Sequence, residues 1–222
     1  MENPRLSIVL ALSLLSLVGL SAAIESPQFS VVHKESDFEI RLYRRSTWMA
    51  AQINQLSFQK ATLLGFHRLF QFIQGANLNN SRIPMTAPVV TSIVPGSGPF
   101  HSSSYSVRFY LPVKFQDDPP TPLPELKLEP YQWDAHCVAV RKFSGYAKDD
   151  NIVKEAQKLA VSLSRSPWAL PNDGTTDYAY SIAQYDSPFH FIGRVNEVWA
   201  DVKSSGGGDD DDACGSSGIA AY

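Results

Sequence analysis

The chain has 222 residues, of which 44% are hydrophobic and 18% are charged, a composition typical of one globular domain with a full core. The formal net charge is −3, and four acidic residues form the consecutive run Asp209–Asp212. Outside this run the charges nearly balance, and no basic stripe indicates a nucleic-acid partner. Composition therefore predicts a globular protein that binds no nucleic acid.

The first 23 residues are typical of a secretory signal peptide. Arg5 precedes the apolar run Leu6–Leu20, and Ser21-Ala22-Ala23 offers a cleavage site before Ile24. The run is short for a membrane span, which needs roughly 20 predominantly apolar residues, and an uncleaved anchor is the less favoured alternative. We expect a soluble, monomeric mature protein in the secretory pathway or the extracellular space, including the apoplast.

Hydrophobic spacing predicts the first elements after the leader. Phe38–Tyr43 alternates apolar and polar residues, and Trp48–Ile53 is a second apolar strand. Ser57–Gly75 reads as a helix, because apolar residues recur at steps of three and four and Gly75 is a natural stop. The large side chains of this helix could line an apolar pocket. Composition alone favours the alternative, in which they pack on the sheet.

The block Arg82–Phe100 holds four prolines within a β-prone run. Proline lacks a backbone donor and has a fixed φ, so Pro84 and Pro88 cannot lie in the middle of a hydrogen-bonded ladder. The segment between them should be irregular or at a sheet edge. Pro95–Pro99 has the composition of a turn.

The second half of the chain repeats the order of the first. The expected elements are strands at Tyr105–Leu111, Leu126–Leu128 and Cys137–Phe143, a helix capped by Asp150, and strands at Tyr178–Tyr185 and Glu197–Val202. This recurrence predicts an α+β domain over residues 24–203 with pseudo-twofold packing of two halves. Residues 204–222 lack a core-forming pattern, which predicts a disordered Gly- and Asp-rich tail.

The sequence carries no catalytic signature. Phosphate-binding loops, nucleophile elbows and zinc-protease motifs are absent, and two cysteines with five scattered histidines make no zinc spacing. Two cysteines also exclude a disulfide framework; Cys137 is predicted as a buried small hydrophobe, with a bridge to Cys214 as the alternative. Asn79 opens an N-glycosylation sequon that a secreted chain could use.

Several segments resemble the SOUL haem-binding protein family. Met85–Val89 (M-T-A-P-V) and Asn196–Trp199 (N-E-V-W) are specific to it. The similarity extends from about Phe29 to Val202 and includes Gly65–Gly75, Ile83–Val89, Pro95–Phe100, Arg141–Gly145, Tyr185–Pro188 and Arg194–Trp199. The resemblance implies a distorted antiparallel β-barrel with two helices, built as a pseudo-twofold repeat of two β-α-β halves, the fold also expected of effector-binding domains.

The resemblance further implies binding of haem or another porphyrin without catalysis, as a tetrapyrrole carrier or buffer. The ligand would occupy an apolar groove between the first helix and the loop before the last strand. The implied contacts are Leu63, Phe66, His67, Phe70 and Gln71 on the helix, Met85 after it, and Phe189, His190 and Arg194 on the loop. His67 and His190 are weak candidates for axial ligation of iron. The alternative is a protein-interaction module that uses the same groove for a peptide or partner helix.

Two departures from the family pattern bear on this groove. Leu42 stands where some animal members carry a histidine proposed as the axial ligand. Positions that carry methionine or basic residues in other members are apolar or uncharged here, at Leu63, Phe66, Phe70 and Gln71. The expected groove is therefore more aromatic and less basic, and Arg68, His190 and Arg194 are the available partners for propionates.

Overall fold

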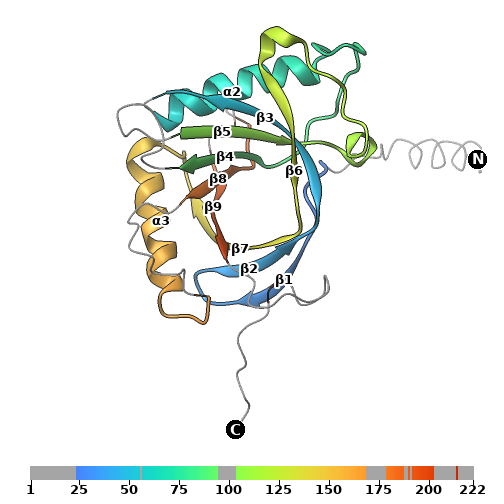
Figure 1. Cartoon of the computed structure of the whole chain (residues 1–222). Helices are drawn as coiled ribbons and strands as arrows, with labels where there is room; N and C mark the ends of the chain where they lie inside the picture. The colour runs from blue at the N-terminus through green and yellow to red at the C-terminus, as the bar shows by residue number, and fades with distance from the viewer. Residues whose placement is uncertain are drawn as a thin grey trace, which may run out of the picture.

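The computed structural model describes residues 24–55, 57–94, 104–168, 179–187, 190, 192–202 and 214. Within these residues the chain forms a nine-stranded antiparallel sheet and two α-helices (Figure 1). The expected leader, the Pro95–Pro99 turn, and the expected tail apart from Cys214 lie outside the described residues. No helix of the described part is long and apolar enough to cross a membrane.

The order of elements confirms the doubled pattern expected from the sequence. The first half contains β1 (Phe29–Lys34), β2 (Glu39–Tyr43), β3 (Ser46–Ile53), α2 (Phe58–Ile73), β4 (Val89–Val94) and β5 (Ser104–Tyr110). The second contains β6 (Leu128–Trp133), β7 (His136–Ser144), α3 (Asp149–Leu163), β8 (Tyr180–Gln184) and β9 (Val195–Val202). Two short 3₁₀ helices, η2 (Val113–Phe115) and η3 (Pro124–Leu126), lie between the halves.

Strand pairing makes the two halves structurally equivalent. The sheet order is β1-β2-β7-β9-β8-β4-β5-β3-β6, with β4 and β8 paired at the junction. Moving outward from this junction, β5, β3 and β6 correspond to β9, β7 and β2. The first strand of each repeat thus pairs with the second strand of the other, as β2 with β7 and β6 with β3. The predicted α+β fold with pseudo-twofold halves is confirmed.

The proline-rich block divides into two parts. Residues 81–88 have no regular secondary structure, and the Ala87–Pro88 peptide bond is cis. Immediately afterwards Val89–Val94 forms β4, which pairs with β5 and β8 in the middle of the sheet. Because both prolines precede Val89, every residue of β4 retains a backbone donor for the ladder. The sequence did not predict β1, which pairs with β2 at one end of the sheet.

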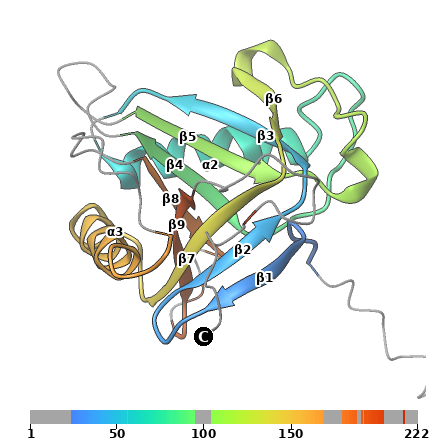
Figure 2. The same cartoon turned by 60° about the horizontal axis from the view of Figure 1, so that its bottom comes forward.

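The curled sheet has two differently composed faces (Figure 1, Figure 2). The convex face packs against α2 and α3, and its apolar side chains form the larger core, which includes Met49, Phe109 and Ile182. The concave face carries a second, aromatic cluster around Trp48 and Trp199. Successive side chains of a strand point to opposite faces, so each strand contributes residues to both clusters.

Helix α2 approaches the sheet closely because Gly65 faces it. A Cβ atom at Gly65 would lie 2.4 Å from Cγ2 of Val107 on β5. The Thr62 hydroxyl lies 3.0 Å from that of Thr91 on β4. A bulkier residue at position 65 would move the helix away from β5, so this glycine sets the position of α2.

The two helices also meet at their N-terminal ends. Asp149, the first residue of α3, accepts hydrogen bonds from the Ser57 hydroxyl at 2.8 Å and from the Phe58 amide at 2.6 Å. Ser57 is the N-cap of α2 and also accepts from Lys60 N. A carboxylate at a helix N-terminus satisfies free amides and complements the helix dipole. The predicted cap of the second helix shifts, since its N-cap is Lys148 rather than Asp150.

A disulfide joins Cys137 on β7 to Cys214, with a Cα–Cα distance of 5.6 Å and a sequence separation of 77 residues. The preferred expectation of a reduced Cys137 is therefore wrong, and the alternative bridge forms. Cys137 is indeed buried in the convex core, where Cys214 packs beside it. Spacing could not reveal the pair, because Cys214 follows the last strand in a segment with no pattern of its own.

Candidate functional site

Helix α2 divides its side chains between the core and the outer surface. Its buried residues are Phe58, Ala61, Gly65, Leu69, Phe72 and Ile73. Leu63 is 69% exposed and Phe70 is 40% exposed. Phe66 is half-buried, and its ring stacks on that of Phe70 with the centroids 5.8 Å apart. Residues three and four apart are neighbours on a helix surface, so Leu63, Phe66 and Phe70 form one apolar stripe.

The exposure of this stripe bears on the two interpretations of the helix, a pocket lining or packing on the sheet. Sheet packing, the alternative favoured by composition, accounts for the buried residues of α2 but not for Leu63 or Phe70. His67 and Gln71 are exposed on the same helix, and Met85 in the following segment is 43% exposed. An exposed apolar stripe flanked by polar side chains is typical of a ligand- or partner-binding surface.

The loop between β8 and β9 is organised by Arg194, which is only 4% exposed. Its Nη1 donates hydrogen bonds to the carbonyl oxygens of Ser187 at 2.7 Å and His190 at 2.8 Å. Its guanidinium lies 4.4 Å from the centre of the Tyr146 ring. Arg194 therefore holds the loop against the turn before α3, and most of its donors point into the loop.

His190 is the accessible residue of this loop, with a side chain that is 51% exposed. Its Nδ1 lies 2.8 Å from Oδ1 of Asp186, whose Oδ2 accepts a hydrogen bond from Val195 N at 2.6 Å. A carboxylate partner on Nδ1 fixes the ring and leaves Nε2 as the outward nitrogen. Phe189, expected beside it, lies outside the described residues.

The predicted contacts fall into two groups in space. Leu63, Phe66 and Phe70 share the outer side of α2, whereas His190 and Arg194 belong to the β8–β9 loop. Within the described residues, no hydrogen bond, ion pair or ring contact joins the two groups. The described residues also contain no cluster of three potential metal ligands.

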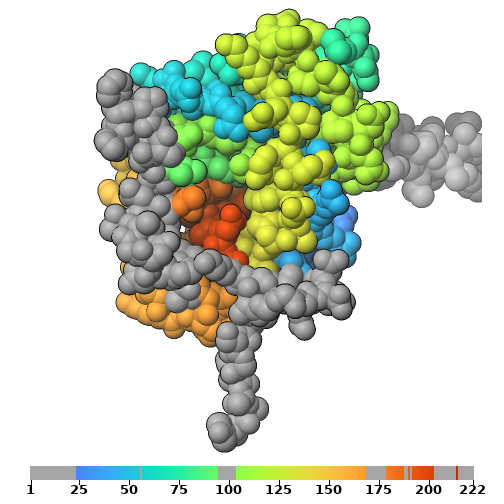
Figure 3. All heavy atoms as spheres, viewed as in Figure 1, coloured from blue at the N-terminus to red at the C-terminus, as the bar shows by residue number. Residues whose placement is uncertain are grey.

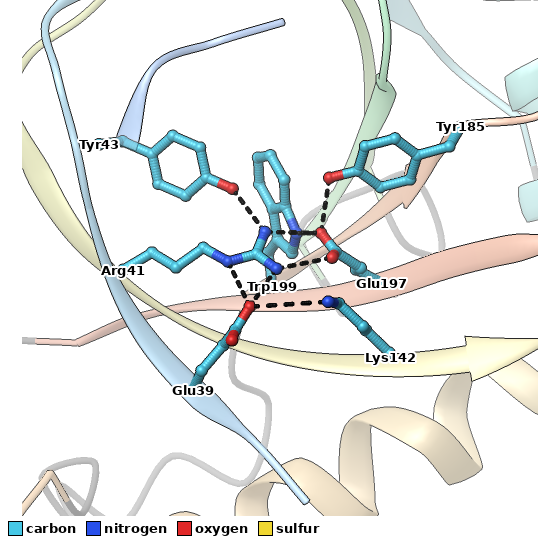
Figure 4. A network of polar contacts seen from close by, with 7 residues as sticks. All are labelled: Glu39, Arg41, Tyr43, Lys142, Tyr185, Glu197 and Trp199. Carbon is cyan, nitrogen blue, oxygen red and sulfur yellow. Dashed lines mark hydrogen bonds and ion pairs between the residues drawn. The ribbon is translucent and has the colours of Figure 1, made fainter. Parts of the chain in front are cut away.

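Sequence reasoning missed a buried polar network on the concave face (Figure 4). Arg41 on β2 forms two hydrogen bonds with Glu197 on β9, from Nη2 to Oε1 at 2.8 Å and from Nη1 to Oε2 at 3.0 Å. Glu197 also accepts from the Tyr185 hydroxyl at 2.7 Å and from Trp199 Nε1 at 2.8 Å. Glu39 binds the other side of the Arg41 guanidinium.

The network perturbs the ionisation of its members. Burial opposes the charge on Arg41, but its hydrogen bonds and charge interaction with Glu197 prevail and raise its pKa. Burial raises the pKa of Tyr185, and the neighbouring Glu197 carboxylate raises it further. In the sequence, Glu39 and Arg41 occupy the polar positions of an alternating strand, which are ordinarily solvent-exposed. Nothing local indicated a carboxylate partner on a distant strand.

A polar hollow of about 560 Å³ lies at one edge of the sheet, away from the predicted groove. Its lining includes Gln28, Arg44, Thr47, Gln116 and Gln132. Its lining also includes Tyr110 and Val113, but most of the lining side chains are polar or charged, in contrast to the stripe on α2.

The family model described as "SOUL heme-binding protein" matches residues 24–201. The chain is 33% identical over 183 residues to the human protein named "Heme-binding protein 2", covering 80% of this chain and 85% of that protein. It is 28% identical over 188 residues to "Heme-binding protein 1" of Xenopus laevis, covering 82% and 94%. The solved structure titled "Crystal structure of EcmrR C-terminal domain" aligns with a TM-score of 0.50 at 10% identity, covering 75% and 96%, and this likeness concerns the fold alone.

Proposed function

Because this chain belongs to the SOUL heme-binding protein family, we propose that it binds haem or a related tetrapyrrole without chemical turnover, as a carrier or buffer. The observation that carries the proposal is the apolar stripe Leu63-Phe66-Phe70, which α2 does not use in the core. The ligand would lie along this stripe, bounded by Met85 and by the loop that carries His190.

The stripe supports useful affinity without a bond to iron. If a tetrapyrrole buries roughly 400 Å² of apolar surface at about 25 cal/mol/Å², the gross gain is on the order of 10 kcal/mol. Loss of translational and rotational freedom consumes much of this gain. Affinity in the micromolar range is the resulting rough expectation.

Propionates and iron would be served by the polar groups that flank the stripe. Most Arg194 donors already serve loop carbonyls, so Arg68 and His190 are the better partners for a propionate. His190 also has the Asp186 partner that metal-binding histidines commonly carry, which makes it a stronger axial candidate than His67.

Hemin titration followed by the Soret band tests the proposal, using the chain with its Cys137–Cys214 disulfide intact. Phe70→Asp places a charge in the stripe and should abolish the Soret shift. Val161→Asp is the matched control, because Val161 is 51% exposed on α3 and should leave binding unchanged. No Soret shift of the unmodified protein at micromolar hemin would remove the proposal. Incubated haem should stay chemically unchanged, since a carrier does not convert its ligand.

Metal-free porphyrin separates apolar binding from iron ligation. Equal affinity for hemin and metal-free porphyrin would show that iron is irrelevant to binding. If His190 is the axial ligand, His190→Ala should change the Soret maximum and His67→Ala should not. An unchanged spectrum in both variants would refute axial coordination while leaving apolar binding intact.

The same stripe also suits an amphipathic partner helix, since Leu63, Phe66 and Phe70 recur at helical spacing. Pull-down from extracellular fluid, with and without added porphyrin, distinguishes the two uses. A partner that porphyrin displaces would indicate that both bind at the stripe. A partner that is captured by a protein which binds no porphyrin would favour the interaction module.

Secretion is part of the proposed function. A disulfide between Cys137 and Cys214 persists in oxidising compartments, and residues 1–23 have the composition of a signal peptide. Asn79 is exposed in the turn after α2, where a glycosylating enzyme could reach it. These observations support a protein that meets its tetrapyrrole outside the cytosol.

A further inference from the structure

Among the described residues, two arginines face the concave side of the sheet, and only Arg41 forms an ion pair with a carboxylate. Arg41 on β2 is paired with Glu39 and Glu197. Arg108 on β5 lies between Ala50 of β3 and Val90 of β4 in the strand register. Within the described residues, no ion pair joins Arg108 to any carboxylate. A half-buried cation that forms no ion pair is only partly compensated, so a carboxylate from outside the protein would stabilise it.

The hydrogen bonds of Arg108 leave one edge of its guanidinium free. Nη1 donates to the Ser92 hydroxyl at 2.9 Å, and Ser92 is linked to the Ser181 hydroxyl at 2.8 Å. Nε is buried without a hydrogen-bond partner, and Nη2 makes no hydrogen bond within the described part of the chain. The Nε–Nη2 edge presents two parallel N–H donors, which is the geometry that a carboxylate accepts.

A neighbouring hydroxyl is also unsatisfied. Ser106, two residues before Arg108 on the same face of β5, is 8% exposed, and its Oγ has no hydrogen-bond partner. Buried hydroxyls are normally paired, and an unpaired one beside an unpaired guanidinium edge indicates a polar ligand or water at this place. Ser106 and Arg108 thus each contribute an unused donor on the same face of β5.

The surroundings of Arg108 favour a single negative charge. Burial lowers its pKa, while Tyr131 and Asp201 oppose this through charge interactions at a distance. The Glu129 carboxylate on β6, which lies beyond β3 in the sheet, accepts a hydrogen bond from Gln52 instead. One guanidinium without a counter-ion is neutralised by one carboxylate, whereas a phosphate dianion would leave an excess of negative charge.

Aromatic rings provide the walls of the cluster. The Arg108 guanidinium lies 4.0 Å from the centre of the Tyr131 ring and 5.8 Å from that of Trp133. Arg108, Ser92, Ser181 and Tyr131 are half-buried, whereas Arg108 Nε and the Ser106 hydroxyl lie on the enclosed side of the cluster. In Figure 3, the atoms of β8 and β9 are visible between those of β4 and β6.

We propose that Arg108 and Ser106 form a binding site for a small carboxylate that carries a planar apolar group. The carboxylate would accept from the Nε–Nη2 edge of Arg108 and from the Ser106 hydroxyl, and the planar group would pack against Tyr131 and Trp133. This site lies on the concave face, whereas the stripe of α2 lies on the outer side of the convex face. It is thus a second site, independent of the proposed tetrapyrrole groove.

Benzoate is the probe, and neutral benzamide of the same shape is its control. Arginine Nε–H and tryptophan indole N–H signals in ¹H–¹⁵N spectra report on the site directly. Benzoate should shift the Arg108 and Trp133 signals saturably, with a dissociation constant of roughly 1 mM for one charged pair and one ring. Benzamide should produce no saturable shift of these signals.

Three variants of the full chain complete the test. Arg108→Gln should weaken benzoate binding by about tenfold or more, and Ser106→Ala, which adds no bulk, by a few-fold. Arg45→Gln is the control, because the Arg45 side chain is 73% exposed and should leave binding unchanged. Thermal unfolding of each variant shows whether it is folded, and Ser106→Ala keeps the test valid if Arg108→Gln does not fold.

Four outcomes would overturn the proposal. The first is no saturable shift when benzoate is present at about ten times its expected dissociation constant, and the second is equal binding of benzamide. The third is benzoate binding that neither Arg108→Gln nor Ser106→Ala weakens, and the fourth is tighter binding of inorganic phosphate than of benzoate. The first three would reduce Arg108 and Ser106 to a hydrated structural pair. The last would replace the carboxylate class with phosphate.

Discussion

Arg41 on β2 and Glu197 on β9 form a doubly hydrogen-bonded ion pair across 156 residues of sequence, and each side chain is only 3% exposed. Both strands pair with β7 from opposite sides, so the ion pair spans three strands of the sheet. The pair therefore joins the first repeat to the second, and its removal tests how strongly the concave face depends on it.

Arg41→Met should lower the free energy of unfolding by about 3–5 kcal/mol, because it leaves Glu197 buried without a cation. Glu197→Gln should cost less, since Glu39 still pairs with Arg41 and glutamine keeps an acceptor for Tyr185. Urea unfolding measures both. The control is Arg45→Met at the exposed Arg45–Asp134 pair, where a change within about 1 kcal/mol is expected. Equal losses for Arg41→Met and Arg45→Met would contradict the burial argument.

Gly65→Ala should destabilise the protein by about 1–3 kcal/mol, because the added Cβ would lie 2.4 Å from Val107 Cγ2. Val107→Ala should relieve this clash, so the double variant should lose less than the sum of the two single losses. Denaturant unfolding of the four proteins gives the coupling energy. Gln59→Ala, at an exposed position of the same helix, should be nearly neutral. Strictly additive losses of unfolding free energy would show that the added methyl group at position 65 does not press on Val107 of β5.

Cys214→Ser should lower the free energy of unfolding by up to about 4 kcal/mol, since the disulfide closes a loop of 77 residues in the unfolded chain. Reduction of the unmodified protein should produce a similar loss, measured by thermal unfolding with and without dithiothreitol. Dithiothreitol should have no further effect on Cys214→Ser, which provides the control. A stable, unshifted transition after complete reduction would show that the bridge contributes little.

Alkaline pH should destabilise the fold through its buried tyrosines. Burial raises the pKa of Tyr180 from 10.0 to about 12, with smaller contributions from Tyr105 and Asp149. As the pH rises, Tyr180 loses its proton first in the unfolded state. Its contribution to the free energy of unfolding is therefore fully present below pH 10 and is lost as the pH rises from 10 towards 12. Tyr180→Phe should flatten this decline, as followed by urea unfolding at several pH values. An identical pH dependence in Tyr180→Phe would assign the decline to other groups.

Expression in a secreting eukaryotic host should release a chain that begins at Ile24, as determined by mass spectrometry, because signal peptidase cleaves after small residues. A glycan on Asn79 should add mass that is removed by a glycosidase and by Asn79→Gln. Ser81→Ala is the matched control, since it destroys the same sequon without changing Asn79. Retention of residues 1–23 in a membrane fraction would instead identify an uncleaved anchor.

Local features of the sequence were sufficient for the order and type of most elements. Alternation defined the strand that became β2, helical spacing and the stop at Gly75 defined α2, and two prolines correctly marked residues 84–88 as irregular. These signals work because propensity, capping and turn chemistry depend on neighbours in the chain. The family motifs Met85–Val89 and Asn196–Trp199 likewise identify relatives without any knowledge of contacts.

The candidate sites depended on contacts that no local pattern encodes. Leu63 and Phe70 fit a core helix by spacing, and only the packing of Gly65 against Val107 decides that they face outward. Cys137 and Cys214 meet because the chain returns to β7 after β9.

By itself, the sequence determined a doubled α+β fold, its family and the helix that carries the apolar stripe. Only the tertiary structure decided that Arg41 is neutralised by Glu197 while Arg108 keeps a free edge. Both arginines look alike in their strands, as basic residues at the polar positions of an alternating pattern. What distinguishes them is which distant strand the curled sheet places opposite each one.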